Sequence, residues 1–325
     1  MKIGVTGASG HIGAALTRVL IEKNYNIRVL EHNDRRGFEG LYVEAVKGSL
    51  SDKDSLNRFC AGMDIVFHLA AKISIGINSY ELLRKVNFEG TKNLVDACKK
   101  SGVKRFIYFS SIHALKHAPL NVPVDENRPL LKDGRSGYER TKALADEWVR
   151  SRGANGMEVI VLNPTAIVGP YDYKPSLMGQ MIIKIYRGKL PLLVPGGYNW
   201  VDVRDVALAA ANVIEKGRNG ERYILSGEWQ TLEGIAQIIS EITGKEIKKI
   251  MIPMFIARFG VPFIYTWSKL TGRRPLYTGQ ALEIISHANK NILSKKAERD
   301  LDFKARPLNA SIKDTIEWFK NNDYI

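Results

Sequence analysis

A loop of regularly spaced glycines near the start of the chain constrains its fold more than any other feature. Residues 2–6 read as a short buried strand, and Gly7, Gly10 and Gly13 lead from it into a helical pattern that begins at Ile12. In this context the first glycine permits a tight turn, the second lets the backbone approach a pyrophosphate, and the third lets helix and strand pack closely. The loop predicts a dinucleotide-binding unit; the alternative is a glycine-rich turn without a ligand.

Strand and helix patterns alternate along the chain as far as Gly227. This alternation predicts an α/β fold, a doubly wound parallel sheet (Rossmann-like) with a smaller, mostly helical substrate domain. We expect 1–164 and 201–227 to form the nucleotide-binding domain, and 165–200 and 228–325 to form the substrate domain. The expected strands are 2–6, 26–30, 41–47, 64–69, 105–109, 158–162 and 222–225, and the expected helices are 12–23, 51–60, 80–100, 138–152 and 203–216.

The charge balance is unusual, because 48 Lys and Arg residues against 34 Asp and Glu residues give a net charge of +14. The basic residues are scattered in pairs, so a solvated basic surface is expected rather than a nucleic-acid site. Hydrophobic residues make up 45% of the chain, as in an ordinary globular protein. Cys60 and Cys98 are expected to be free thiols. Glycines interrupt any apolar segment at the N-terminus, so a cytoplasmic location is expected.

The stretch 252–265 is apolar and carries one charge, Arg258. It is too short to span a membrane, and Pro253 and Pro262 interrupt it, so no stable membrane insertion is expected. An interfacial helix is one interpretation. We favour a pair of helices that covers a small-molecule substrate.

A tyrosine and a lysine four residues apart, Tyr138 and Lys142, lie on one face of an expected helix. The pKa of a free tyrosine is about 10, too high for a base at neutral pH, but a neighbouring ammonium group favours the phenolate. Tyr138 can then exchange a hydroxyl proton while hydride leaves or reaches the same carbon. Ser110 and Ser111 end the fifth strand, where such a sheet presents its site.

Together these motifs resemble the extended branch of the short-chain dehydrogenase/reductase superfamily (the NAD-dependent epimerase/dehydratase family). The similarity is greatest to its dihydroflavonol-reductase-like and sugar-epimerase-like members. The resemblance implies that Ser111, Tyr138 and Lys142 are catalytic and that Lys142 also reaches the nicotinamide ribose. It implies as cofactor-binding residues Thr6, Gly7, Ser9, Gly10, His11, Ile12, Gly13, Glu31, His32, Ser49, Leu50, Leu69, Ala70, Ala71, Asn87, Tyr138, Lys142, Asn163 and Pro164.

The end of the second strand bears on the choice of cofactor. Glu31 follows Gly13 by 18 residues, where a carboxylate binds the adenosine ribose hydroxyls. It would repel a 2′-phosphate, and His32 stands where NADP-using members often have an arginine. NAD is therefore expected, while Arg35 and Arg36 leave NADP open.

Two departures from the family pattern bear on the substrate. Ser49 replaces an Asp that often binds adenine, and Tyr198 lies near the place of an Arg that binds the diphosphate of nucleotide sugars. Asn163 points the other way, because epimerases often have Asn there. A 4,6-dehydratase is set aside, since Ile112 and His113 replace its acid and base.

We therefore expect an NAD(P)-dependent oxidoreductase that transfers hydride between nicotinamide and a secondary alcohol or ketone. The alternatives are a nucleotide-sugar epimerase with tightly bound NAD and a non-catalytic NAD(P) sensor. His68 is expected to be structural. No metal is expected, because His113 and His117 lie in a proline-flanked loop without a Cys or carboxylate cluster.

A homodimer is expected from two helices, 87–100 and 138–152. Both carry small or apolar residues beyond one sheet-facing stripe, and a helix that is apolar on more than one face needs a second partner. These residues are Leu94, Val95, Ala97, Cys98, Ala143, Leu144, Ala145, Trp148 and Val149.

Overall fold

The computed structural model describes residues 1–73, 79–134, 136–153, 156–271 and 277–325. A seven-stranded sheet forms its larger part, with the order β10-β6-β5-β4-β1-β2-β3 and parallel pairing throughout. The strand order reverses between β1 and β4, and such a switch point is where a doubly wound sheet binds its ligand. The strands are β1 Lys2–Thr6, β2 Asn26–Glu31, β3 Glu44–Lys47, β4 Ile65–His68, β5 Arg105–Phe109, β6 Glu158–Pro164 and β10 Arg222–Leu225.

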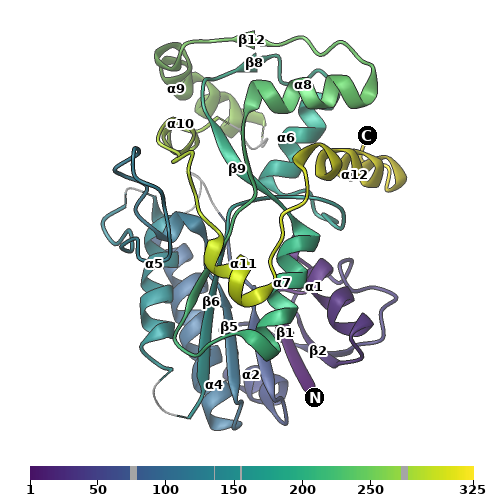
Figure 1. Ribbon diagram of the computed structural model, residues 1–325, viewed down its shortest axis with the longest axis vertical. Coiled ribbons are helices and arrows are strands. Elements are labelled where there is room, and N and C mark those ends of the chain that lie inside the picture. Colours follow the sequence, from purple (N-terminus) through teal and green to yellow (C-terminus); the bar gives the residue numbers. More distant parts are fainter. Residues whose placement is uncertain (74–78, 135, 154–155, 272–276) are drawn as a thin grey trace.

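Helices cover both faces of this sheet (Figure 1). One apolar core holds residues of α1 and α7, and a second holds residues of α2, α4 and α5. Because both faces are covered, the central strands β1, β4 and β5 are buried over nearly their whole length. These helices are α1 His11–Glu22, α2 Lys53–Cys60, α3 Tyr80–Arg84, α4 Gly90–Lys100, α5 Gly137–Arg150 and α7 Val203–Lys216, with a short 3₁₀ helix at Ile112–Ala114.

A smaller domain stands at the carboxyl ends of the strands (Figure 1). It has a third apolar core around Trp200. It contains strands that the sequence did not predict, in a three-stranded sheet of order β11-β9-β7 and a pair β12-β8. Its elements are β7 Ala166–Val168, α6 Leu177–Tyr186, β8 Leu192–Leu193, β9 Gly197–Asp202, β11 Glu228–Thr231, α8 Leu232–Thr243, β12 Ile250–Met251, α9 Met254–Thr271, α10 Gly279–Ser286 and α12 Leu308–Asn321.

The α/β class and the doubly wound sheet are confirmed, but three details differ from expectation. The helix expected at 80–100 contains a π-helical turn, Lys85–Glu89. The expected helix pair at 252–265 is wrong, because a single helix, α9, runs through Pro262. Helix α11 (Lys295–Leu301) packs on α7 and β10, and Leu301 and Phe303 lie in the first core. That segment therefore belongs to the nucleotide-binding part, although 228–325 was assigned to the substrate domain.

Helices α4 and α5 leave less apolar surface for a homodimer contact than the sequence suggested. Of the residues that motivated it, all but Leu144 and Trp148 are buried within one chain, because α4 and α5 pack against the sheet and each other. Trp148 makes an edge contact with Phe88 on the outer side. The homodimer stays a prediction that depends on this smaller patch.

Candidate active site

The glycine loop has the geometry of a phosphate cradle. Gly7 has φ +73°, and a Cβ there would come within 2.6 Å of the Ala70 nitrogen. A Cβ on Gly13 would lie 2.1 Å from the Gly7 oxygen. Gly10 is exposed and precedes α1, whose first N–H groups receive no side-chain cap among the described residues. Unpaired N–H groups at an exposed helix N-terminus fit a dinucleotide pyrophosphate.

A chain of hydrogen bonds joins the loop to the neighbouring strand end. The Thr91 hydroxyl donates to the Asn87 carbonyl at 2.7 Å, so it accepts from His68 Nε2 at 2.9 Å. His68 Nδ1 then accepts from Thr6 at 2.7 Å, and Thr6 accepts from the Ala70 N–H at 3.3 Å. Burial lowers the pKa of His68 to about 3, so the ring is neutral. Both ring nitrogens are engaged in hydrogen bonds within the fold, which is consistent with a structural histidine.

The residues expected around the adenosine lie at adjacent strand ends. Glu31 ends β2, and its carbonyl accepts from the Gly48 N–H at 2.9 Å. His32 is exposed just beyond. Ser49 and Leu50 follow β3, where the Ser49 hydroxyl meets that of Ser51 at 3.0 Å. Leu69 and Ala71 flank Ala70 after β4, so the predicted set converges on the carboxyl edge of β1, β2, β3 and β4.

An ion pair beside this edge was not predicted. Arg36 binds Asp34 through two contacts, Nε to Oδ1 at 2.9 Å and Nη2 to Oδ2 at 2.6 Å. The hydrogen bond from Arg36 lowers the pKa of Asp34. The guanidinium is therefore already paired, which removes one of the two cations that left NADP open.

Ser111 and Tyr138 are brought together at the end of β5. Tyr138 lies in the first turn of α5 with 9% of its surface exposed. Burial raises the pKa of Tyr138 to about 12, and a weaker opposing effect comes from a hydrogen bond with Ser111. The sequence led us to expect a pKa lowered by the neighbouring ammonium. That expectation is wrong for this structure, because burial outweighs the other effects.

Lys142 lies one turn further along the same face of α5 and is 4% exposed. Its Nζ donates to the Phe109 carbonyl at 2.7 Å and to the Tyr108 hydroxyl at 3.4 Å. Burial lowers the pKa of Lys142 to about 7, partly offset by the charge of Asp146. The Lys142 ammonium thus forms its hydrogen bonds at the end of β5 rather than with the Tyr138 hydroxyl. Tyr108 was missed, since a strand aromatic carries no sequence signal for this contact.

Two asparagines hold backbone around the site. Asn163 Nδ2 donates to the Ser111 carbonyl at 2.8 Å, next to Pro164 at the end of β6. Asn163 Oδ1 and Ser110 Oγ are buried and have no partner among the described residues. Asn87 contacts the Lys72 backbone and the Thr141 side chain. Unsatisfied buried polar atoms are rare in native proteins, so those of Ser110 and Asn163 fit a site that takes a polar ligand.

A second unpredicted contact joins the loop to the smaller domain. His11 Nε2 lies 3.2 Å from the Gly169 carbonyl and 3.0 Å from that of Pro170. The sequence singled out His11 but offered no sign of its contact with the segment after β7. Ile12 and Ser9 are partly exposed beside His11, so this end of α1 borders both domains.

His113 and His117 have ring centroids 5.4 Å apart. Burial lowers the pKa of His113 to about 3 and that of His117 to about 4. Among the described residues no group of three or more His, Cys, Asp or Glu side chains could hold a metal ion.

Comparisons with known proteins agree with this geometry. Residues 3–226 match the model of the NAD dependent epimerase/dehydratase family. The chain is 30% identical to sterol demethylase protein B of Methylococcus capsulatus, over 99% of both chains. It is 29% identical to a putative dihydroflavonol 4-reductase of Synechocystis, over 99% of this chain and 95% of the relative.

Among solved structures, the crystal structure of gox2253 is similar, with 33% identity, a TM-score of 0.86 and 99% of both chains covered. The family match covers most of the chain and includes the glycine loop, Ser111, Tyr138 and Lys142. The chain belongs to the NAD dependent epimerase/dehydratase family, and is an NAD-dependent enzyme of the extended short-chain dehydrogenase/reductase class.

Proposed function

We propose that this protein is an NAD(P)-dependent oxidoreductase that interconverts a secondary alcohol and a ketone, with Tyr138 as general acid and base. The observation that carries the proposal is the buried group at the end of β5. There the Tyr138 phenol has a hydrogen bond with Ser111, and Lys142 lies one helical turn away. A hydroxyl, a phenol and a lysine in this order support proton transfer to or from a substrate oxygen.

The protonation state of Tyr138 suits a proton donor. Its pKa of about 12 keeps the phenol protonated at neutral pH. NAD, in its reduced form, would supply the hydride to the ketone carbon, and Tyr138 would donate its proton to the ketone oxygen, giving the alcohol. Ser111 would hold that oxygen by a hydrogen bond. Lys142 would hold the nicotinamide ribose, while Asn163 would keep the Ser111 backbone in position.

A ring compound that bears a ketone or secondary alcohol is the substrate class that we propose. The names of two relatives refer to a sterol and a dihydroflavonol, both ring compounds. Tyr198 bears on the epimerase alternative, because it is buried against Trp200 with ring centroids 5.5 Å apart. A buried phenol at that position offers no cation to a nucleotide diphosphate, which disfavours the epimerase alternative.

Turnover of Tyr138→Phe tests the assignment. The protein is incubated with NADH and a panel of cyclic ketones, and absorbance at the nicotinamide band is followed. We expect a loss of roughly 10²- to 10⁴-fold in kcat with NADH affinity unchanged, because the phenol oxygen moves a proton but adds little to cofactor binding. Tyr186→Phe, at a partly buried tyrosine of α6 in the smaller domain, is the matched control.

Two results would contradict the proposal. Wild-type turnover by Tyr138→Phe would remove Tyr138 from the mechanism. Conversion of a UDP-hexose to its epimer, with NAD that copurifies and does not exchange, would establish the epimerase instead.

We also propose a homodimer through α4, α5 and the π-helical turn before α4, centred on Phe88, Leu144 and Trp148. Light scattering should give twice the chain mass of 36.4 kDa. A mass equal to one chain at micromolar concentration would rule this interface out as a stable one.

A further inference from the structure

Helix α9 is apolar on two opposite faces. Its inner face, with Ala257 and Val261, packs into the core of the smaller domain. Its outer face carries Phe255, Phe259 and Phe263, spaced by four residues and therefore aligned on one side. These rings are 72%, 75% and 67% exposed. Folding of the smaller domain accounts for the inner face only, so the outer face needs a separate explanation.

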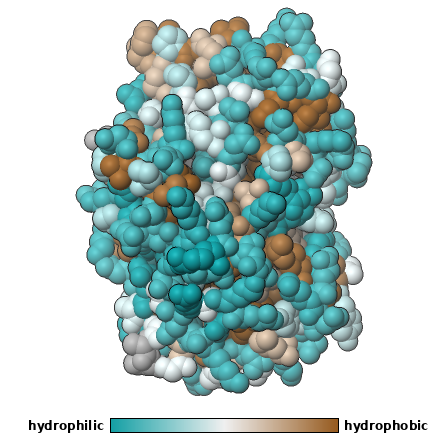
Figure 2. All heavy atoms as spheres, in the orientation of Figure 1, coloured by the Kyte–Doolittle hydropathy of each residue, from teal (hydrophilic) through white to brown (hydrophobic). Residues whose placement is uncertain are grey.

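The apolar surface continues onto the strand before the helix. In β12, Ile250 is 57% exposed and Met251 is 40% exposed, and only Ile252 and Pro253 separate this strand from α9. Figure 2 shows apolar atoms gathered at the end of the molecule where Figure 1 places α9. Contiguous exposed apolar surface on a soluble fold marks a site of contact with another body.

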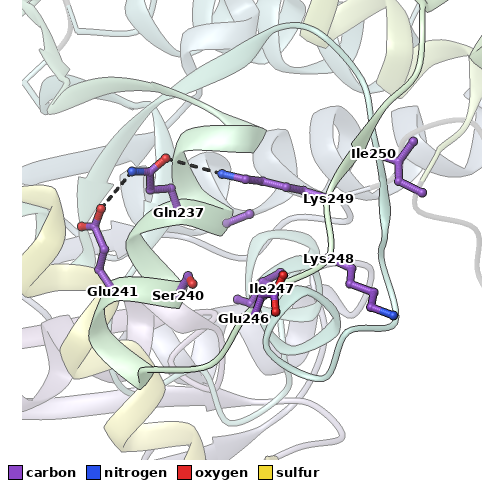
Figure 3. Close-up of a pocket in the computed structure, with 9 residues that line it drawn as sticks. Gln237, Ser240, Glu241, Glu246, Ile247, Lys248, Lys249 and Ile250 are labelled. Atoms are coloured by element: carbon purple, nitrogen blue, oxygen red, sulfur yellow. Dashed lines mark hydrogen bonds between the residues drawn. The ribbon is translucent and has the colours of Figure 1, made fainter.

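Within the sequence from Ile247 to Leu282 all formal charges are positive. The chain has no Asp or Glu between Glu246 and Glu283, whereas Lys248, Lys249 and Arg258 lie within that stretch and are exposed. Lys249 turns toward α8, where it donates to Gln237 Oε1 at 3.4 Å, while Lys248 and Ile250 extend away from α8 (Figure 3). Aromatic side chains flanked by lysine and arginine are typical of helices that lie in the interface of an anionic bilayer.

A second copy of the chain fits this surface less well. A two-fold contact would place the same patch on both sides and bring Lys248 and Arg258 of one copy near those of the other. Like charges at such an interface oppose association. Anionic lipid headgroups would instead neutralise Lys248 and Arg258. The net charge of +14 adds a long-range attraction of the protein to an anionic membrane.

We propose that the outer face of α9, with Ile250 and Met251 of β12, docks on the surface of an anionic lipid bilayer. The helix has 18 residues, so it would lie along about 27 Å of the interface with its phenylalanine rings among the acyl chains. It would not cross the bilayer: no helix of the described residues is both long and apolar enough for that. The interfacial helix that the sequence left as an alternative is thus the interpretation we adopt.

Vesicle binding tests the proposal without reference to activity. The full chain is sedimented with vesicles of phosphatidylcholine alone and of phosphatidylcholine with 30% phosphatidylglycerol. We expect binding to the anionic vesicles that weakens as NaCl is added. Phe255→Ser and Phe259→Ser should each weaken it roughly tenfold, and Lys248→Gln roughly fivefold. These side chains are exposed, so the variants should fold, which circular dichroism checks.

The matched control is Tyr42→Ser, an aromatic residue that is 97% exposed in the nucleotide-binding part; its vesicle binding should equal the wild type. The proposal is overturned if the wild type stays in the supernatant with anionic vesicles, or if Phe255→Ser and Phe259→Ser bind as well as it does. It is equally overturned if light scattering shows a dimer that Phe259→Ser dissociates and vesicles do not bind, because the face is then a protein interface.

Discussion

The side-chain amide of Asn87 pairs with the backbone of Lys72 in both directions. The Lys72 N–H donates to Asn87 Oδ1 at 2.7 Å, and Asn87 Nδ2 donates to the Lys72 carbonyl at 3.1 Å. The same Nδ2 also donates to Thr141 Oγ1 at 3.2 Å, between Tyr138 and Lys142 in α5. One side chain thus ties the segment after β4 to the helix with the proposed catalytic residues. Asn87 itself lies in the π-helical turn Lys85–Glu89, and such turns are frequent at functional sites.

Asn87→Leu should loosen this connection. Leucine offers no replacement for the bonds to Lys72, and a buried polar group left unpaired costs about 1–3 kcal/mol. We expect a lower unfolding midpoint and weaker NAD binding, because Ala70 and Ala71 lie just before Lys72. Calorimetry and thermal melts measure the two effects. Asn212→Ala, which removes one bond to the Leu301 carbonyl far from the site, should lower stability only.

Lys142→Met should separate activity from stability. The pKa of Lys142 is lowered to about 7, so the folded state binds fewer protons than the unfolded state between pH 7 and about 10.4. The buried ammonium therefore costs stability near pH 7, and this cost disappears as pH rises through that window. We expect the variant to melt no lower than the wild type at pH 7 while turnover falls at least about 100-fold. A variant that unfolds readily at pH 7 would show that the bond to Phe109 outweighs desolvation.

Cofactor choice should depend on Glu31 and on the Asp34–Arg36 pair. NAD(H) should bind more tightly than NADP(H), since Glu31 repels a 2′-phosphate and Arg36 is already paired. Asp34→Asn should free Arg36 and tighten NADP(H) binding by roughly tenfold. Glu31→Ala should also reduce the preference for NAD(H) over NADP(H), because the repulsion of the 2′-phosphate is removed. Titration calorimetry on apo protein decides this, and tighter NADPH binding by the wild type would reverse the assignment.

The chain should be sensitive to acid because of three buried histidines. The pKa values of His68, His113 and His117 are lowered to about 3, 3 and 4 by burial. Between pH 6.5 and those values the unfolded state binds more protons, so stability falls as pH falls. Each histidine contributes up to about 1.4 kcal/mol per pH unit. Urea unfolding measures the free energy of unfolding at pH 7 and at pH 5. Its decrease between the two pH values should be smaller for His117→Gln than for the wild type, whereas His287→Gln, at an exposed histidine, should match the wild type.

Much of the fold follows from short-range patterns. The glycine loop, the alternation of strands and helices and the spacing of Tyr138 and Lys142 each depend on residues close in sequence, so their local structure could be predicted. Val203–Lys216 and Arg222–Leu225 were predicted to the residue. The strands β8 and β12, which were not predicted, have two residues each, and two residues are too few to show the alternation of apolar and polar residues that marks a strand.

The tertiary structure decided what depends on burial and on distant neighbours. Whether Tyr138 has a raised or a lowered pKa depends on how much of the phenol is removed from water, which spacing does not encode. The pairing of Asn87 with Lys72, 15 residues away, required the packed chain. Helix α9 is the clearest case: its composition was consistent with a substrate cover, but only packing showed Ala257 and Val261 turned inward and three phenylalanines turned to solvent. A sequence reports how apolar a helix is, whereas the fold determines which of its faces stays in contact with water.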